Sequence, residues 1–137
     1  MKQISEKDFD YATLILRVVL GIFFAVAGLA QLASWAAGYK DTFTGFAIIS
    51  QVGATPSLVG ILVPWIELIL GVLLIFGIAT SVVAALVAFI AFVFVAANGF
   101  TQGASLAKEI LFVAVGLALM LLGGGNISFD GKIRGKK

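Results

Sequence analysis

Four long apolar runs constrain this chain more than any other feature of its sequence. They cover about residues 12–33, 56–77, 80–98 and 106–122. A helix that crosses the hydrocarbon core of a bilayer needs roughly 17–25 residues, which is the length of each run. Hydrophobic residues make up 61% of the 137 residues and charged residues 12%, whereas a soluble domain has about 45–50% and about 25%. The sequence predicts a single all-α integral membrane domain over residues 1–137, an antiparallel transmembrane four-helix bundle.

The connections between the runs add local expectations. Thr55 and Pro56 suit the N-cap and the first position of the second helix. Residues 77–81 are too few for anything but a tight hairpin between the second and third helices. The first outer loop, residues 34–55, contains aromatic residues of the kind enriched at membrane interfaces. It forms either a short interfacial helix that starts at Asp41 or an ordinary loop with aromatic anchors; the aromatic residues are Trp35, Tyr39, Phe43 and Phe46.

The distribution of positive charge predicts the orientation in the membrane. With four crossings both termini lie on one side, and that side carries most of the lysines and arginines near the helix ends. They are Lys2, Lys7, Lys132, Arg134, Lys136 and Lys137, against Lys40 and Lys108 on the other side. The positive-inside rule places both termini in the cytoplasm and makes this a multi-pass protein of the cell membrane. Because the basic residues do not cluster on a soluble domain, nucleic acid is not an expected partner.

A few polar residues interrupt the apolar runs, and they are the candidate ligand-binding or proton-relay groups. Insertion of a charged side chain at the centre of a membrane helix costs about 2.5–3.5 kcal/mol, so such residues are usually functional. Arg17 lies in the first run and Glu67 in the middle of the second. Nearer the outer surface lie Gln31, Asn98 and Glu109, of which Glu109 is expected to be solvated or interfacial. Together they predict a sparse polar line from the outer face through Glu67 to Arg17.

Each run also has one face of small and polar residues at helical spacing. Small residues allow membrane helices to approach closely, and polar residues turn away from lipid. These faces are therefore expected to meet in the bundle interior. The glycines expected to pack the helices together are Gly21, Gly28, Gly71 and Gly116.

Arg17 and Glu67 have two alternative interpretations. Counted from the cytoplasmic ends of their runs, Arg17 lies about six residues in and Glu67 about ten, a depth difference on the order of 6–8 Å. An intramembrane ion pair, direct or through water, is therefore one hypothesis. In the other, Arg17 extends to the cytoplasmic headgroups while Glu67 is protonated and hydrogen-bonded. Pro64 removes a backbone donor one turn before Glu67, which favours a kink beside the carboxylate.

The chain has no cysteine and no histidine. Thiol chemistry, histidine-ligated haem, the usual zinc sites and histidine-based proton transfer are therefore excluded. The sequence predicts no metal site, no covalently bound cofactor and no self-sufficient set of catalytic residues. At most, the chain is a subunit of an oxidoreductase that needs a partner to carry electrons.

Three segments resemble the DoxX family of four-helix membrane proteins, and together they extend over nearly the whole chain. The first helix contains LRVVLGIFF (16–24) and AGLAQL (27–32), the second contains ELILGVLLIFG (67–77), and the chain closes with GGGNISFD (123–130). Where many members carry a lysine after the first-helix glycine, this chain has Gln31, so a cationic role at that position does not carry over. The resemblance implies a four-helix bundle associated with redox systems, since relatives include a subunit of a thiosulfate:quinone oxidoreductase and membrane partners of redox-protection proteins.

The expected function is therefore that of an accessory subunit in a redox or quinone-linked membrane system. A quinone ring needs an apolar slot with a few polar partners, and Glu67, Arg17 and Gln31 are candidates to supply them. Expected partners are the lipid bilayer, a redox protein and a second copy of the chain. Two alternatives from other classes are a small proton-coupled transporter that uses Glu67, and a membrane scaffold or assembly factor that binds no small ligand.

Overall fold

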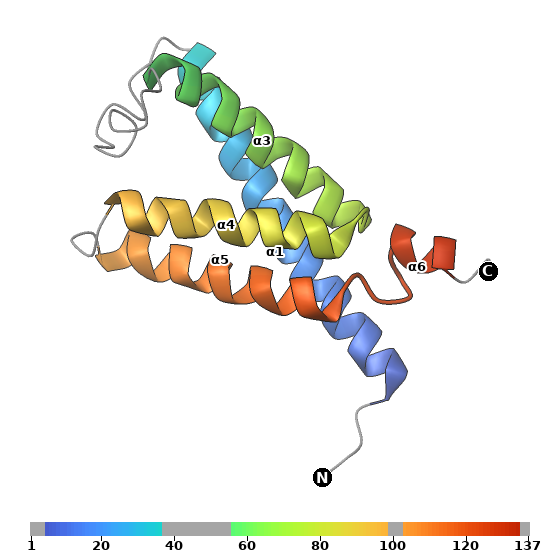
Figure 1. Ribbon diagram of the computed structural model, residues 1–137. Coiled ribbons are helices and arrows are strands. Elements are labelled where there is room, and N and C mark those ends of the chain that lie inside the picture. The colour runs from blue at the N-terminus through green and yellow to red at the C-terminus, as the bar shows by residue number, and fades with distance from the viewer. Residues whose placement is uncertain (1–4, 37–55, 99–102, 135–137) are drawn as a thin grey trace.

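A computed structural model describes residues 5–36, 56–98 and 103–134, and Figure 1 shows their arrangement. Every regular element in these ranges is a helix, as predicted. Four long helices account for most of the described residues, and one short helix lies near the C-terminus. Their bounds are α1 Glu6–Ala36, α3 Pro56–Phe76, α4 Thr80–Asn98, α5 Gly103–Leu122 and α6 Phe129–Arg134.

The helix ends follow from local sequence. α1 begins at Glu6 rather than near residue 12, because acidic residues in a first turn interact favourably with the helix dipole. α3 begins with Pro56, as predicted, and ends before Gly77, whose φ of +70° suits glycine. There the backbone N–H of Ile78 donates to the carbonyl of Leu73 at 3.0 Å, which closes the helix C-terminus. α5 begins at Gly103, earlier than its apolar run; the proposed interfacial helix starting at Asp41 lies outside the described residues.

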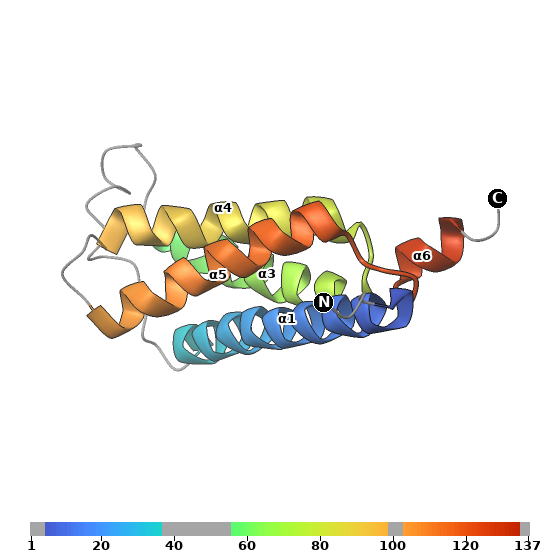
Figure 2. The same cartoon turned by 90° about the horizontal axis from the view of Figure 1, so that it is seen from below.

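The long helices pack in two antiparallel pairs, α1 with α3 and α4 with α5 (Figures 1 and 2). The four glycines expected at helix contacts lie where backbones approach closely. A Cβ added at Gly28 would lie 2.5 Å from the carbonyl oxygen of Pro64, and one at Gly116 would lie 3.0 Å from that of Ala84. Gly21 and Gly71 face each other in the same way across α1 and α3. Small residues therefore set the distance between the helices of each pair.

A buried apolar core joins the two pairs, and large apolar side chains also cover the outside. The core residues are Leu20, Phe24, Leu70, Leu74, Val83, Ala84, Val87 and Leu119. Outward-facing residues include Ile69, Phe89 and Leu121, the last of which is 80% exposed. Among the described residues, one helix (6–34) is long and apolar enough to cross a membrane by length and composition, and two shorter apolar helices cover 61–76 and 80–96.

The segment after α5 folds back over one end of the bundle. Residues 123–128, called here the closing segment, lead from α5 to α6, and α6 lies at the end of the bundle where α1 begins (Figures 1 and 2). We call this end the terminal end. The turn between α3 and α4 also lies there, because Gly77 contacts Ser128. The terminal end thus gathers parts of all five described helices.

Candidate functional site

The mid-bundle carboxylate is hydrogen-bonded to the first helix. Glu67 on α3 is only 4% exposed, and Nε2 of Gln31 on α1 donates to its Oε2 at 2.5 Å. The contact is possible because Gly28 lets α1 approach the backbone of α3 at Pro64, one turn before Glu67. The other amide atom of Gln31, Oε1, is buried and accepts no hydrogen bond from any residue that the structure describes. The pair therefore offers one unused acceptor beside a carboxyl group.

Two charged residues of α5 lie near this pair. Glu109 is 9% exposed, so the structure buries it rather than leaving it solvated. Its Oε1 lies 3.3 Å from Nζ of Lys108, and both residues are close enough to act on the charge of Glu67. Nζ of Lys108 also lies 6.0 Å from the ring centroid of Phe112. Gln31, Glu67, Lys108 and Glu109, from three helices, are referred to below as the Glu67 cluster. Of the other candidates, Asn98 is the last residue of α4, and its side chain lies outside the described residues.

Arg17 does not belong to the Glu67 cluster. It is 2% exposed, and its Nη1 donates to the carbonyl oxygen of Gly124 in the closing segment at 2.8 Å. Its guanidinium lies against Gly77, where an added Cβ would be 2.7 Å from Cζ. Asp130 is close enough to act on its charge. The side chain thus points toward the terminal end, and its partner among the described residues is a backbone carbonyl.

The structure does not bring Arg17 and Glu67 together, so the hypothesis of an ion pair between them is wrong. Glu67 precedes Gly77 by ten residues along α3, which separates the two groups by roughly 15 Å at 1.5 Å per residue. The prediction counted depth from the ends of the apolar runs. Because α1 extends back to Glu6, Arg17 lies at the level of the α3–α4 turn instead of deeper in the bundle.

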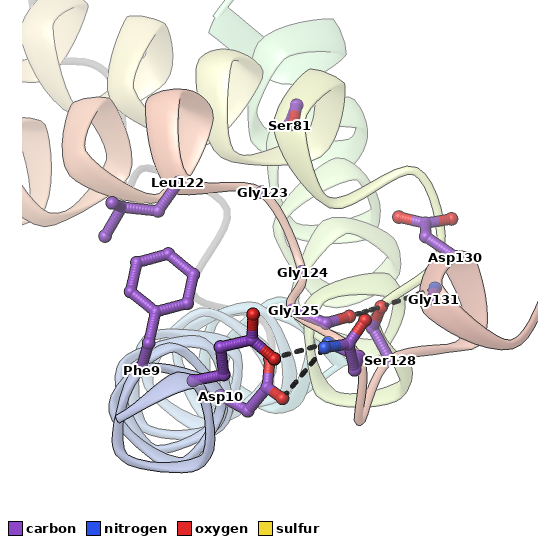
Figure 3. Close-up of a pocket in the computed structure, with 12 residues that line it drawn as sticks. Phe9, Asp10, Ser81, Leu122, Gly123, Gly124, Gly125, Ser128, Asp130 and Gly131 are labelled. Carbon is purple, nitrogen blue, oxygen red and sulfur yellow. Dashed lines mark hydrogen bonds between the residues drawn. The ribbon is translucent and has the colours of Figure 1, made fainter. Parts of the chain in front are cut away.

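A second set of polar contacts ties the closing segment to α1. Asp10, which is buried, accepts hydrogen bonds from the backbone N–H of Asn126 at 2.8 Å and from its Nδ2 at 3.0 Å (Figure 3). Thr13, one turn further along α1, is fully buried and lies against Gly125. Together with Arg17, these residues fix the closing segment to one face of α1.

The closing segment and α6 each supply a side chain that caps a helix start. Oδ1 and Oδ2 of Asp130 accept hydrogen bonds from the backbone N–H groups of Ala79 at 2.8 Å and Thr80 at 2.7 Å, at the N-terminus of α4. Oγ of Ser128 accepts from the N–H of Gly131 at 2.9 Å and so caps α6. Asp10, Asn126, Ser128 and Asp130 were not among the site residues predicted from the sequence. The closing GGGNISFD motif was the available signal for Asn126, Ser128 and Asp130. For Asp10, the signal was its spacing of seven residues from Arg17, which places both on one face of a helix.

The Glu67 cluster contains the groups that could exchange a proton or bind a polar ligand. A carboxyl group can release and take up a proton, and an amide can bind a carbonyl or a hydroxyl group. Within residues 5–36, 56–98 and 103–134, the structure places no group of three or more acidic, cysteine or histidine residues where they could hold a metal ion.

Comparison with known proteins agrees with the resemblance in sequence. The DoxX family model matches residues 12–102, which is more than half of the chain. A protein of Bacillus subtilis (strain 168) named "Putative oxidoreductase CatD" is 40% identical over 83 residues, which cover 61% of this chain and 56% of that protein. The chain thus spans little more than half the length of this relative. No solved structure matches the chain. From the extent of the family match, the chain belongs to the DoxX family.

Proposed function

We propose that this protein is a four-helix membrane subunit of a quinone-linked redox system, in which Gln31 and Glu67 bind the quinone headgroup. The proposal places all four long helices in the bilayer, with the terminal end in the cytoplasm. Its membrane part is supported by the outward-facing apolar side chains on every long helix, such as Ile15, Ile69, Phe89 and Leu121. Monomeric soluble proteins rarely expose contiguous apolar surface of this extent.

The observation that carries the proposal is the unused acceptor on Gln31. A buried acceptor without a hydrogen bond costs about 1–3 kcal/mol, so a ligand that donates a hydrogen there is stabilised. A quinol hydroxyl is such a donor, and the neighbouring Glu67 carboxylate accepts the proton that the hydroxyl loses on oxidation. Oxidation of a quinol to a quinone releases two electrons and two protons. Gln31 and Glu67 account for binding and for one proton acceptor; the second proton passes to solvent, and both electrons pass to a partner.

A partner must carry the electrons, because the chain contains no cysteine or histidine to ligate a redox metal centre. Membership of the DoxX family and the name of the Bacillus subtilis relative support an association with an oxidoreductase. The function we assign to this chain is therefore that of an accessory subunit. It holds the quinone and handles a proton while a redox protein removes or supplies the electrons.

The test is quinone binding by the purified protein in a neutral detergent. Organic extraction and mass spectrometry would identify quinone that copurifies with the protein, and titration with decylubiquinone or menadione would give an affinity. We expect Glu67→Gln and Gln31→Leu to weaken binding at least tenfold. Asp8→Asn, which removes an exposed carboxylate of α1, should leave it unchanged. Absence of quinone from the protein, together with equal affinities of all variants, would refute the proposal.

The same purified protein can be used to distinguish a proton-coupled transporter from a quinone-binding subunit. Vesicles that contain the protein and a pH-sensitive dye would report proton movement when a pH gradient is imposed. A subunit that only exchanges a proton with bound quinone produces no movement in the absence of quinone and an oxidant. Quinone-independent proton flux that Glu67→Gln abolishes would favour a transporter instead.

A further inference from the structure

A cavity of about 560 Å³ lies at the terminal end of the bundle (Figure 3). The first turns of α1, the end of α5, the closing segment and α6 form its walls, together with Ser81 of α4. It is separate from the Glu67 cluster, none of whose members lines it. The proposed function does not use this cavity.

The charged groups of the wall all have the same sign. Glu6, Asp10 and Asp130 line the cavity, and no lysine or arginine is among its described lining residues. The Arg17 guanidinium lies behind the wall, where it is bound to Gly124 and close to Asp130, so the charges that face the cavity are mainly those of Glu6 and Asp10. Each oxygen of Asp10 accepts one hydrogen bond from Asn126, which leaves further acceptor capacity on the carboxylate. The Glu6 side chain is exposed and lies at the cavity wall. The cavity therefore favours a positively charged occupant.

An apolar surface lies beside these carboxylates. The ring of Phe9 and the side chain of Leu122 lie next to each other at one side of the cavity, while Asp10 lies below the closing segment (Figure 3). Lysine and arginine side chains combine an apolar stem with a charged head, and they bury the stem along such surfaces. The hydroxyl of Ser81 supplies a further polar atom on the opposite wall.

We propose that this cavity binds a lysine or arginine side chain of a partner protein on the cytoplasmic side of the membrane. This proposal rests on the proposed function, which places the terminal end in the cytoplasm and requires a partner protein. Charge complementarity selects a basic protein segment over a lipid headgroup. An aminophospholipid would bring its phosphate close to the carboxylates of Glu6 and Asp10, where like charges repel.

The test uses thiol chemistry, because the chain has no native cysteine. Ser81→Cys places one thiol on the cavity wall, and the protein in neutral detergent is modified with a trimethylammonium methanethiosulfonate or with its sulfonate counterpart. After correction for their rates with free cysteine, we expect the cationic reagent to react at least about tenfold faster. Glu6→Gln should lower this ratio roughly fivefold. Leu122→Cys repeats the measurement from the apolar side if the first variant does not fold.

The matched control is Asp8→Asn, which removes the same charge from the same turn of α1 but does not line the cavity. It should change the ratio less than about twofold. A ratio near one in the Ser81→Cys protein, or equal effects of the Glu6 and Asp8 substitutions, would overturn the proposal.

The occupant is identified by protection of the same thiol. A blocked Gly-Arg-Gly peptide should slow modification of the Ser81→Cys protein, and the slowing should be lost in the Glu6→Gln background. Equal protection by the citrulline peptide would show that charge is not recognised. Protection by phosphatidylethanolamine vesicles, but not by the peptide, would assign the cavity to lipid. Quinone binding is measured separately with Glu67→Gln, so failure of either proposal is seen without the other.

Discussion

The carboxylate of Asp130 is predicted to hold the N-terminus of α4 in place from the far end of the chain. It accepts two backbone hydrogen bonds, from Ala79 and Thr80, although Asp130 follows them by some fifty residues. Loss of a helix cap costs about 1–2 kcal/mol, and loss of a negative charge at a helix N-terminus adds about 0.3–1 kcal/mol. Asp130→Ala should therefore lower the free energy of unfolding by about 1.5–3 kcal/mol, and Asp130→Asn, which keeps one acceptor oxygen, by roughly half as much.

The free energy of unfolding can be measured by titrating the protein in mixed micelles with sodium dodecyl sulfate. Hydrogen exchange with mass spectrometry locates the effect, and we expect faster exchange at residues 79–83 in the Asp130→Ala protein. The control is Asp8→Ala, which removes an exposed carboxylate that accepts one backbone hydrogen bond, from Ser5. Its effect should stay below about 1 kcal/mol. A loss in Asp130→Ala no larger than in the control, or unchanged exchange at the start of α4, would refute this account of the cap.

Three further predictions concern the same contacts and use the same unfolding measurement. Gly71→Ala should destabilise the protein by about 1–3 kcal/mol, because the new Cβ meets the backbone of α1; Val72→Leu, at an exposed neighbour, should change stability by less than about 0.5 kcal/mol. Arg17→Ala should cost roughly 2–4 kcal/mol, since it leaves a space and an unpaired Gly124 carbonyl, and an effect below that of Val72→Leu would contradict the buried contact. Asp10→Ala and Asn126→Ala should be non-additive by about 0.5–1.5 kcal/mol in a double-mutant cycle; additive losses would mean that the side chains do not interact.

The long helices were predictable because their signal is long and their ends are chemically marked. The residues 80–98 and the start at Pro56 agree with the structure. The start of α1 was missed because the apolar run records only the part of a helix that avoids water, whereas acidic residues extend α1 back to Glu6. α6 was missed because it is six residues long and polar, and it depends on Ser128 as its cap.

The candidate site was predictable in composition but not in pairing. Burial of Glu67 follows from its place in an apolar run. The hydrogen-bond partner of Glu67 does not follow from the sequence, because it depends on the register in which α1 packs along α3. The glycines Gly21, Gly28 and Gly71 fix that register, and periodicity places them on the same face without stating which residues they oppose. This register brings Gln31 to Glu67 and leaves Arg17 to the closing segment.

The register also interrupts the predicted polar line. Between the Glu67 cluster and the terminal end, the helices are apolar over residues 18–30 of α1, 68–76 of α3, 82–96 of α4 and 110–122 of α5. With Arg17 bound to Gly124 below this layer, none of these stretches carries a group that can pass a proton to the terminal end. Under the proposed function, the proton that Glu67 exchanges therefore travels on the side of Lys108 and Glu109. Proton exchange then takes place on the outer side of the apolar layer and partner binding at the terminal end, so the layer separates them.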